Sequence, residues 1–472
     1  MFKLLLTLLI ASPSEITVHR LENGLRIVFV EDKSLPVFCG FIQFDVGSAC
    51  EAPGLTGVSH LLEHMLFKGT KKLGTTNYKK EAKLNAILEN LYITMDTVSD
   101  STLRFALKDS IEKVQNELSK YIISEEIWRI YSMHGGVMMN ASTSNTSTQY
   151  YVMLPSNKKE LWFKVESDRF KNLVLREFFS ERNVVNEERR MSESNPYYKL
   201  WGSLFATAYI ASPIRWPIIG WEDDIMNVKP DQVMWYYKTH YTPDNCIIVL
   251  VGDVDIENDL KLTKKYFGDW KGSKTDLFRI TGEPAQSEVR RVEIIGPGKP
   301  TMGIGFKGPY YPDREYYALE LFSYIFGEAE GSIIQRNLVK RGIIFDGGSS
   351  LSSWQGKAPS IFLLELHPAT GISMNSLEKE IFSLLDSLKT SGIDDASLKK
   401  AKNNYRMSFV KRQKEHLYLA FTAASGLRIA DDPEYYKKEL EIIDSITAEE
   451  VKTAISKYLT KNQGTIVTLG GE

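Results

Sequence analysis

The chain has 472 residues, of which 58 are basic and 60 are acidic, so its formal net charge is −2. This length can form two or more domains with a substantial core. Near-neutral charge, with no basic stripe interleaved with aromatic residues, argues against nucleic acid as a partner. The three cysteines, Cys39, Cys50 and Cys246, form neither a metal-binding spacing nor a disulfide framework.

The first 14 residues resemble a short secretory signal. Lys3 precedes an apolar run over residues 4–11, and a Ser-Pro-Ser sequence follows at residues 12–14. The run is far too short to span a bilayer, so we expect no transmembrane segment. We favour export, to the periplasm or the medium, over the alternative of a cytoplasmic protein with a chance apolar start.

Apolar patterning predicts strands within residues 17–31 and 37–46, followed by a short helix that carries His60, Glu63 and His64. Side chains four apart share one helix face, so the two imidazoles can bind one metal ion. Neutral imidazoles suit Zn²⁺, and a carboxylate beside the metal can take a proton from water. This is the His-x-x-Glu-His order of the inverzincins. The alternative, a merely polar helix face, is disfavoured because the helix is mostly apolar and the chain has only seven histidines.

Residues 71–133 are rich in Lys, Glu, Leu, Ile and Asn. We interpret this stretch as an insertion of two or three helices, of which residues 103–122 form the clearest.

A catalytic zinc site uses three protein ligands, so one more must come from elsewhere in the chain. The best candidate is Glu188, on a helix that we expect to begin with Ser180 as its N-cap. Glu181 lies two turns before Glu188 on the same face, so it can hydrogen-bond to a metal ligand from behind. Spacing alone favours the alternative that residues 187–190 form a solvated charged face.

The second half of the chain repeats the pattern of the first. Strands are expected at residues 291–295 and 301–308, and a helix over residues 314–326 takes the place of the histidine helix but has no histidine. We therefore predict an α+β fold of two homologous α/β-sandwich domains, each a mostly antiparallel sheet with helices packed on one face. The predicted units are residues 1–14 (signal), 15–270 (first domain), 271–289 (linker) and 290–472 (second domain).

The motifs of the first half resemble the pitrilysin/insulinase family of zinc metallopeptidases, and especially the zinc-bearing subunit of its processing-peptidase branch. The likeness covers most of residues 15–270 and is weaker in the second half. The matching segments are residues 23–28, 47–51, 57–70, 135–151, 181–188, 217–220, 241–245 and 251–253.

The resemblance implies one Zn²⁺ per chain, held by His60, His64 and Glu188, the second glutamate of its pair. It implies that Glu63 is the general base and that Glu181 is the carboxylate behind the ligands.

The resemblance also implies how substrate and partner bind. Asn140 and Ala141 would lie on an edge strand that pairs with the substrate backbone by β-augmentation. The family completes its site with an Arg and a Tyr seven residues apart, but those positions here hold Leu338 and Phe345. Neither side chain can stabilise an oxyanion by hydrogen bonding, so we expect a homologous partner subunit to supply the Arg and Tyr.

These features predict a zinc-dependent endopeptidase subunit that cleaves short or unfolded peptides inside a closed chamber, as part of a heterodimer. One alternative is a non-catalytic core or assembly subunit of the same superfamily, which is disfavoured because all the ligands are present. The other is a peptide-binding subunit, which Leu338 and Phe345 slightly favour.

Overall fold

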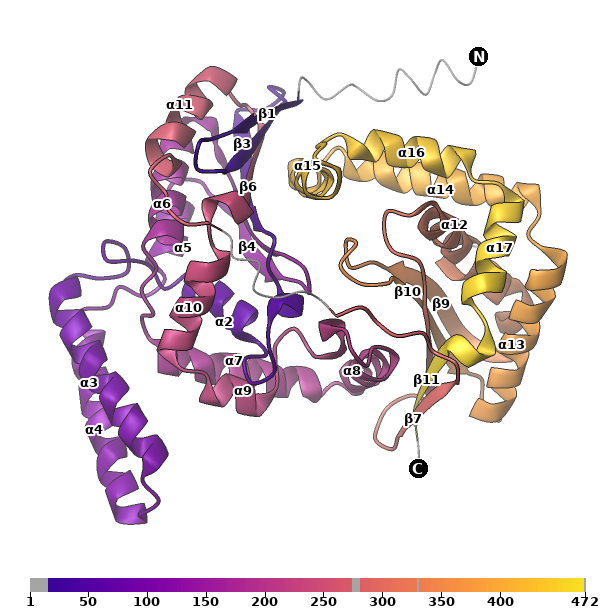
Figure 1. Ribbon diagram of the computed structural model, residues 1–472, viewed down its shortest axis with the longest axis horizontal. Coiled ribbons are helices and arrows are strands. Elements are labelled where there is room, and N and C mark those ends of the chain that lie inside the picture. Colours follow the sequence, from indigo (N-terminus) through magenta and orange to yellow (C-terminus); the bar gives the residue numbers. More distant parts are fainter. Residues whose placement is uncertain (1–15, 274–280, 329–330, 471–472) are drawn as a thin grey trace.

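The computed structural model describes residues 16–273, 281–328 and 331–470. It contains two sheets, one from each half of the chain, both mostly antiparallel and packed against helices (Figure 1). This confirms the predicted α+β class. The predicted signal at residues 1–14 and part of the predicted linker, residues 274–280, lie outside the described residues. The domain boundaries stay predictions.

The first sheet has six strands. They are β1 (Ile16–Arg20), β2 (Arg26–Glu31), β3 (Val37–Phe44), β4 (Val137–Thr143), β5 (Thr148–Pro155) and β6 (Cys246–Gly252). Their order is β1-β2-β6-β3-β5-β4, and within the described residues β2–β6 is its one parallel pair. Every residue of β6 is buried, because this central strand is covered on both faces. In contrast to β6, β4 lies at one edge of the sheet.

Helices from the first half cover one face of this sheet. They are α2 (Val58–Met65), α6 (Lys159–Lys171), α7 (Phe178–Glu193), α9 (Glu222–Asn227), α10 (Pro230–His240) and α11 (Ile256–Phe267). Alternate residues of the strands, such as Ile27, Phe29 and Ile42, pack with the apolar face of α2 in one continuous core. The histidine helix is therefore fixed by its apolar side to the sheet.

The predicted insertion contains three helices, α3 (Tyr78–Thr97), α4 (Ser101–Ser119) and α5 (Glu126–Met133). The first two form a hairpin that projects away from the sheet (Figure 1). Helix α4 starts two residues before the expected position because the Asp100 side chain accepts the Leu103 N–H at 2.8 Å and caps it. The fully buried pair Glu81–Arg176, at 2.8 Å, fastens α3 to the chain just before α7.

The second sheet has five strands, in the order β7-β11-β8-β10-β9. They are β7 (Arg290–Ile294), β8 (Thr301–Lys307), β9 (Ile344–Ser352), β10 (Ile361–Pro368) and β11 (Gly464–Leu469). The helices on one face are α12 (Arg314–Ser323), α13 (Met374–Ser391), α14 (Asp395–Arg412), α16 (Tyr435–Ser445) and α17 (Ala448–Tyr458). Two single-turn π-helical stretches, Tyr324–Glu328 and Gln335–Val339, follow α12. The described residues also contain five 3₁₀ turns: Ser48–Cys50, Ser156–Lys158, Pro213–Arg215, Pro243–Asn245 and Lys461–Gln463.

The second face of each sheet is covered by a helix from the other half. Helix α15 (His416–Ala430) packs on β2, β3 and β6 of the first sheet, where residues such as Ala420 and Ala424 meet Phe41 and Val249. Helix α8 (Pro196–Ala208) packs on β7, β8 and β11 of the second sheet through Leu200, Leu204 and Ala208. The prediction of helices on one face only was therefore incomplete.

Polar contacts also join the two halves. Asp45, just after β3, accepts hydrogen bonds from Lys357 Nζ at 2.7 Å and from Arg428 Nη1 at 3.0 Å. Thr146 Oγ1 bonds to Gln355 Oε1 at 3.0 Å, which ties the β9–β10 loop to the β4–β5 loop. These bonds hold part of the second half next to the end of β4.

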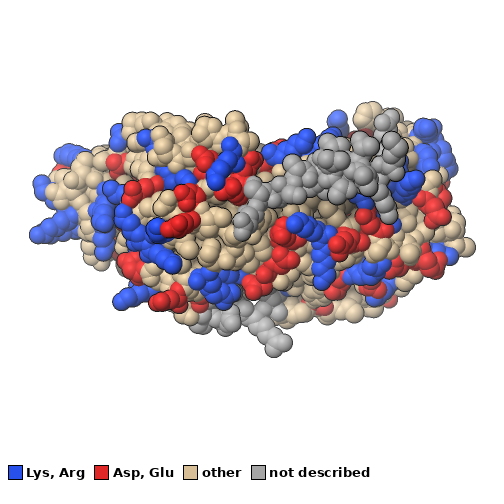
Figure 2. All heavy atoms as spheres, turned by 90° about the horizontal axis from the view of Figure 1, so that it is seen from above, with Lys and Arg blue, Asp and Glu red and all other residues tan. Residues whose placement is uncertain are grey.

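The surface is of mixed charge. Figure 2 shows basic and acidic side chains interspersed on the visible face, in keeping with the near-zero net charge. Within residues 16–273, 281–328 and 331–470, no helix has both the length and the apolar character needed to cross a bilayer.

We predict that Leu204→Ala destabilises the whole chain by about 2–5 kcal/mol, because Leu204 is fully buried between α8 and the second sheet. Urea unfolding followed by circular dichroism measures the change. The control is Lys199→Ala, an exposed position on the same helix, for which we expect a change within about 0.5 kcal/mol. A loss below about 1 kcal/mol for Leu204→Ala would contradict the role given to α8.

Candidate metal centre and its cavity

Helix α2 begins at a position that only glycine adopts easily. Gly57 has a φ of 86°, and a Cβ there would lie 2.3 Å from the Ile219 carbonyl oxygen. No side chain of the helix itself caps its first turn. Instead the buried Glu51 accepts the N–H groups of Gly57 and Ser59, both at 2.8 Å. Burial raises the pKa of Glu51 to about 8, although these two hydrogen bonds act in the opposite direction.

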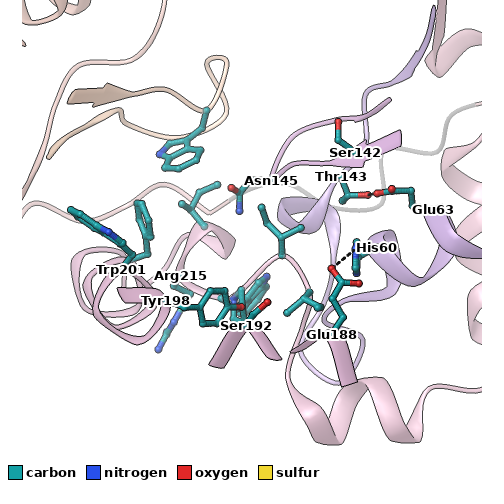
Figure 3. A pocket seen from close by; sticks show the side chains of 18 of the residues that line it. His60, Glu63, Ser142, Thr143, Asn145, Glu188, Ser192, Tyr198, Trp201 and Arg215 are labelled. Atoms are coloured by element: carbon teal, nitrogen blue, oxygen red, sulfur yellow. Dashed lines mark hydrogen bonds and ion pairs between the residues drawn. The ribbon is translucent and has the colours of Figure 1, made fainter. Parts of the chain in front are cut away.

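The structure brings His60, His64 and Glu188 together. One ligand atom from each residue lies within 4.8 Å of the others. Glu188 Oε1 is 3.8 Å from His60 Nε2, and Glu188 Oε2 is 3.6 Å from His64 Nε2. Figure 3 shows Glu188 facing His60 across a small gap.

This donor set fits zinc. Ligand atoms about 2.0–2.2 Å from a tetrahedral zinc ion lie about 3–4 Å from one another. The distances of 3.6 and 3.8 Å between Glu188 and the two histidines fall in this range. Burial, with a smaller effect of His64, lowers the pKa of His60 to about 4, so His60 is neutral and its lone pair is available. His60 Nδ1 is a buried nitrogen without a hydrogen-bond partner among the described residues.

A second carboxylate lies behind the cluster. Glu181 Oε1 is 2.9 Å from His64 Nδ1, and Glu181 Oε2 is 2.5 Å from Lys68 Nζ. Burial of Glu181 opposes its ionisation, but the hydrogen bonds from His64 and Lys68 prevail and lower its pKa below the usual value. An ionised Glu181 fixes the His64 ring so that its other nitrogen, Nε2, faces Glu188.

Helix α7 places Glu181 and Glu188 on one face, as their spacing predicted. Ser180 was wrong as the N-cap: α7 begins at Phe178, after Glu177, which has a left-handed φ of 57°. The apolar side chains of Phe178 and Phe179 are buried, so the helix starts where they enter the core rather than at the polar Ser180.

Glu63 is held by the edge strand β4. Thr143, at the end of β4, donates its hydroxyl to Glu63 Oε2 at 2.6 Å. Burial raises the pKa of Glu63, although this hydrogen bond lowers it in part. Glu63 is thus a largely buried carboxyl group with one fixed oxygen and one oxygen free of this bond.

These groups open into a cavity of about 580 Å³ between the two halves. Figure 3 shows His60, Glu63 and Glu188 at one end, beside Ser142 and Thr143 of β4, and His64 and Ala141 also line the cavity. Helix α8 and the loop around residues 214–219 form the other walls, with Trp354 from the second half.

Asn140 and Ala141 lie on the edge strand β4, where the resemblance placed them. Ala141 lines the cavity. Asn140 is exposed and does not line it, and its side-chain oxygen accepts the Ala141 N–H at 2.9 Å.

The positions expected to hold Arg and Tyr lie away from the cavity. Leu338 is 1% exposed in the core of the second half, and Phe345 is 76% exposed at the start of β9. Neither residue lines the cavity, and nor do the nearby Arg336 and Arg341.

Known proteins resemble this chain over nearly its whole length. The family description "Insulinase (Peptidase family M16)" matches residues 27–101, and "Peptidase M16 inactive domain" matches residues 227–405. The zinc protease PqqE of Helicobacter pylori is 29% identical over 95% of this chain and 91% of its own length. A solved structure of a protease from Helicobacter pylori has a TM-score of 0.81 and 26% identity, covering 97% of this chain and 100% of that one.

The chain belongs to peptidase family M16, the insulinase/pitrilysin family. The resemblance drawn from its motifs is therefore confirmed. A more distant M16 relative, a probable mitochondrial-processing peptidase subunit beta of Arabidopsis thaliana, is 23% identical over 98% of this chain and 79% of its own length. The M16 match at residues 27–101 contains His60, Glu63 and His64, whereas the "inactive domain" match contains no residue of the cluster.

Sequence reasoning missed three features of this M16 site. Lys68 lies one turn after His64, so the i,i+4 spacing could have pointed to its place beside Glu181. Thr143 reaches Glu63 only because β4 runs past α2, which no local pattern reveals. Glu51 lies in the matching segment 47–51, but its role as the cap of α2 depends on the fold of the preceding loop, which the resemblance did not point to.

We predict that Glu51→Ala costs about 2–4 kcal/mol of stability, because two buried N–H groups at the start of α2 lose their acceptor. Thermal and urea unfolding measure the loss. Glu22→Ala, which removes an exposed carboxylate, is the control and should change stability by less than about 0.5 kcal/mol. Equal stability of the two variants would show that the Glu51 contacts do not hold the helix.

Proposed function

We propose that this chain is a zinc-dependent endopeptidase subunit that hydrolyses short or unfolded peptides. The observation that carries the proposal is the convergence of His60, His64 and Glu188 in a cavity that also holds Glu63. The naming of relatives as zinc proteases supports it.

In the proposed reaction the chain's own groups bind, orient and move protons. Zinc bound at this centre would supply a polarised peptide carbonyl and a water molecule of lowered pKa. Glu63 takes the proton from the attacking water and returns a proton to the leaving amine. Thr143 keeps the Glu63 carboxylate in place, and Glu181 orients His64 and increases its basicity.

We propose that the peptide binds in extended form along β4, which has one free edge. Backbone pairing of this kind makes little demand on sequence. Ala141 lies next to the Glu63 end of the cavity, so a peptide along the strand passes the catalytic groups. Asn140, exposed on the same strand, can contact the peptide with its amide.

We also propose a homologous partner subunit that closes the chamber and supplies an Arg and a Tyr. This chain has Leu338 in its core and Phe345 outside the cavity, so within one chain the oxyanion lacks the family's usual donors. The similarity to a processing-peptidase beta subunit, whose name denotes part of an assembly, supports the proposal.

A peptide-binding or assembly role without catalysis is the second candidate. The same Leu338 and Phe345 favour it, as does the "inactive domain" match of the second half. The cluster of ligands and the positioned Glu63 favour catalysis. For location we propose the periplasm or the medium, on the signal-like composition of residues 1–14.

We predict about one zinc per chain, and loss of that zinc in His64→Ala and Glu188→Gln, because each change removes a ligand. Elemental analysis after dialysis measures it, with circular dichroism to check the fold. His134→Ala and Glu187→Gln are matched controls outside the cluster and should keep the metal. Full zinc in His64→Ala would refute the assigned ligands.

Glu63→Gln should keep zinc but lower peptide hydrolysis about 10²–10⁴-fold, because glutamine keeps the shape of glutamate without its basicity. Turnover of an unstructured peptide, together with zinc content, measures the effect. Glu187→Gln is the control, since Glu187 is exposed and pairs with Arg190. Glu181→Gln should fall between them, with a loss of about 10–100-fold in metal affinity or activity. Near-normal turnover of zinc-loaded Glu63→Gln would exclude Glu63 as the base.

The chain alone should be weakly active, and adding a homologue that carries the Arg and Tyr should raise cleavage at least about 10²-fold. Turnover of each chain and of the mixture, with mass by light scattering, tests this. Full activity of the isolated chain would contradict the heterodimer. It would direct attention to Tyr198 and Arg215, which line the cavity within this chain.

A further inference from the structure

Arg176 is a buried arginine whose hydrogen-bonding capacity is completely used. Its side chain is 1% exposed. Three of its N–H groups donate to backbone carbonyls of the segment that follows α2, those of Lys68 at 2.5 Å, Thr70 at 2.8 Å and Leu73 at 3.0 Å. The other two donate to the carboxylate of Glu81 at 2.8 and 3.1 Å. A guanidinium has five N–H donors in one rigid plane, so Arg176 is fixed in place by all of them.

Two glycines let the chain close around this guanidinium. Gly69 and Gly74 have left-handed φ angles of 99° and 81°. A Cβ on these residues would lie 2.8 and 2.5 Å from Arg176 Nη1, which is too close for any side chain. Residues 68–74 therefore form a loop that is built around Arg176, and we call it the Arg176 loop.

The Arg176 loop begins at the exit of the histidine helix. The Phe67 N–H donates to the His64 carbonyl at 3.0 Å. The next N–H, that of Lys68, donates to the Met65 carbonyl at 3.1 Å, so the loop continues directly from the last turn of α2. Because Arg176 holds the Lys68 carbonyl, it also fixes the point from which the Lys68 side chain extends.

Lys68 links this loop to the metal centre. Its Nζ is 2.5 Å from Glu181 Oε2, and the other oxygen of Glu181 is 2.9 Å from His64 Nδ1. By contrast, His60 Nδ1 has no hydrogen-bond partner among the residues that the structure describes. The orientation of the ligand set therefore depends on the contacts behind His64, and these contacts depend on the position of Lys68.

Arg176 also lies at the entry of the second helix that carries a ligand. It is followed by Glu177, which has a left-handed φ of 57°, and α7 begins at the next residue. Glu177 Oε2 is 3.7 Å from Lys68 Nζ, so the two segments also meet through their side chains. Since α7 carries Glu181 and Glu188, one guanidinium joins the exit of α2 to the entry of α7.

The inserted hairpin completes this junction. Glu81, in the first turn of α3, is fully buried and gives Arg176 its counter-charge. A buried guanidinium without such a partner would be strongly unfavourable. Farther along α3, the Tyr92 ring stacks on the Phe179 ring of α7, with centroids 3.8 Å apart and planes at 13°. The hairpin is therefore attached to Arg176 and to α7 at separate points.

We infer that Arg176 is a positioning residue of the metal centre, which orients the zinc ligands through Lys68 and Glu181, and that the inserted hairpin takes part through Glu81. The inference rests on the zinc site of the proposed function and adds to it the residues that set its geometry. Arg176 bonds to none of the ligand side chains, so its effect passes through the loop. Loss of a group that orients a metal ligand commonly costs about 10–100-fold in metal affinity.

The first test is the zinc Kd of the full chain, measured by competition with a chromogenic chelator. Arg176→Lys keeps the charge beside Glu81 but cannot hold three carbonyls and a carboxylate together, so we expect the Kd to rise about 10–100-fold. Leu385→Ala, fully buried in the core of the second half, is the control for a general loss of stability. It should lower the urea midpoint and leave the zinc Kd unchanged. A wild-type Kd in folded Arg176→Lys, or an equal rise in Leu385→Ala, would overturn the inference.

The second test changes a residue that is partly exposed, so the fold is not at risk. Lys68→Met keeps the aliphatic stem and removes the ammonium group, and the zinc Kd should rise as in Arg176→Lys. Lys68→Arg, which can still donate to Glu181, should restore most of the affinity. Lys72→Met removes a lysine of the same loop that is 82% exposed and should leave the Kd unchanged. A wild-type Kd in Lys68→Met would overturn the inference, whether or not Arg176→Lys folds.

The third test concerns the hairpin. Glu81→Gln leaves the buried guanidinium without its counter-charge, so we expect the zinc Kd to rise in the same direction. Glu112→Gln removes an exposed carboxylate from the same hairpin and is the matched control. Equal Kd values for these two variants would exclude the hairpin from the positioning of the metal centre.

A double variant tests the path from Arg176 to the ligands. Because Arg176 acts through Lys68, combining Arg176→Lys with Lys68→Met should raise the zinc Kd no further than the stronger single change. Effects that multiply would show two independent contributions and would overturn the path.

Peptide turnover, measured on the same variants, separates the inference from the proposed function. A chain that shows these changes in zinc Kd but cleaves no peptide refutes the peptidase and leaves the positioning role intact. Normal turnover together with a wild-type Kd in Lys68→Met refutes the positioning role and leaves the peptidase intact. A wild-type chain that binds no zinc would overturn both.

Discussion

Each sheet of this protein has an apolar second face, and the arrangement of the two halves follows from the need to bury both of these faces. Strands such as β6 are apolar at every position, so a sheet with helices on one side alone would leave many apolar side chains in water. Each half of the chain supplies one helix that covers the sheet of the other half: α15 lies on the first sheet and α8 on the second. The two halves are therefore one packed unit rather than two independent lobes.

The metal centre depends on that exchange. Glu188 and Glu181 lie on α7, which leads through a short turn directly into α8, and α8 is fixed to the second sheet. His60 and His64 lie on α2, fixed to the first sheet. The relative position of the histidines and Glu188 thus follows partly from how the halves dock, and the contacts of Glu181 with Lys68 and His64 then fix the orientation of the His64 ring. Electrostatics refines a geometry that apolar packing establishes.

The sequence was most informative where function depends on local spacing. His60, Glu63 and His64 share a helical turn, and Glu181 and Glu188 share a face, as their spacing predicted. The structure also brings Glu188 to the two histidines, which the resemblance implied but spacing alone did not favour. Contacts made through the tertiary fold, such as that of Thr143 with Glu63, or through the path of a loop, such as that of Glu51 with α2, have no periodic signal. The N-cap of α7 was wrong because core packing of Phe178 and Phe179 outweighs the local preference of Ser180. The helix exchange was missed because a helix apolar on two faces does not show which surface each face covers.

The exchange of α8 and α15 has a consequence for synthesis on the ribosome. The last strand of the first sheet, β6, ends at Gly252, but the helix that covers its second face begins only at His416, about 160 residues later. At about 5–20 residues per second, that face stays without its native cover for about 10–30 s. During this interval the nascent first half presents Phe41, Val249 and their neighbours to solvent, a surface suited to a chaperone or to misassociation with another nascent chain. The first sheet can thus be fully covered only after α15 has been synthesised, so this M16 chain cannot complete its fold until its C-terminal part has left the ribosome.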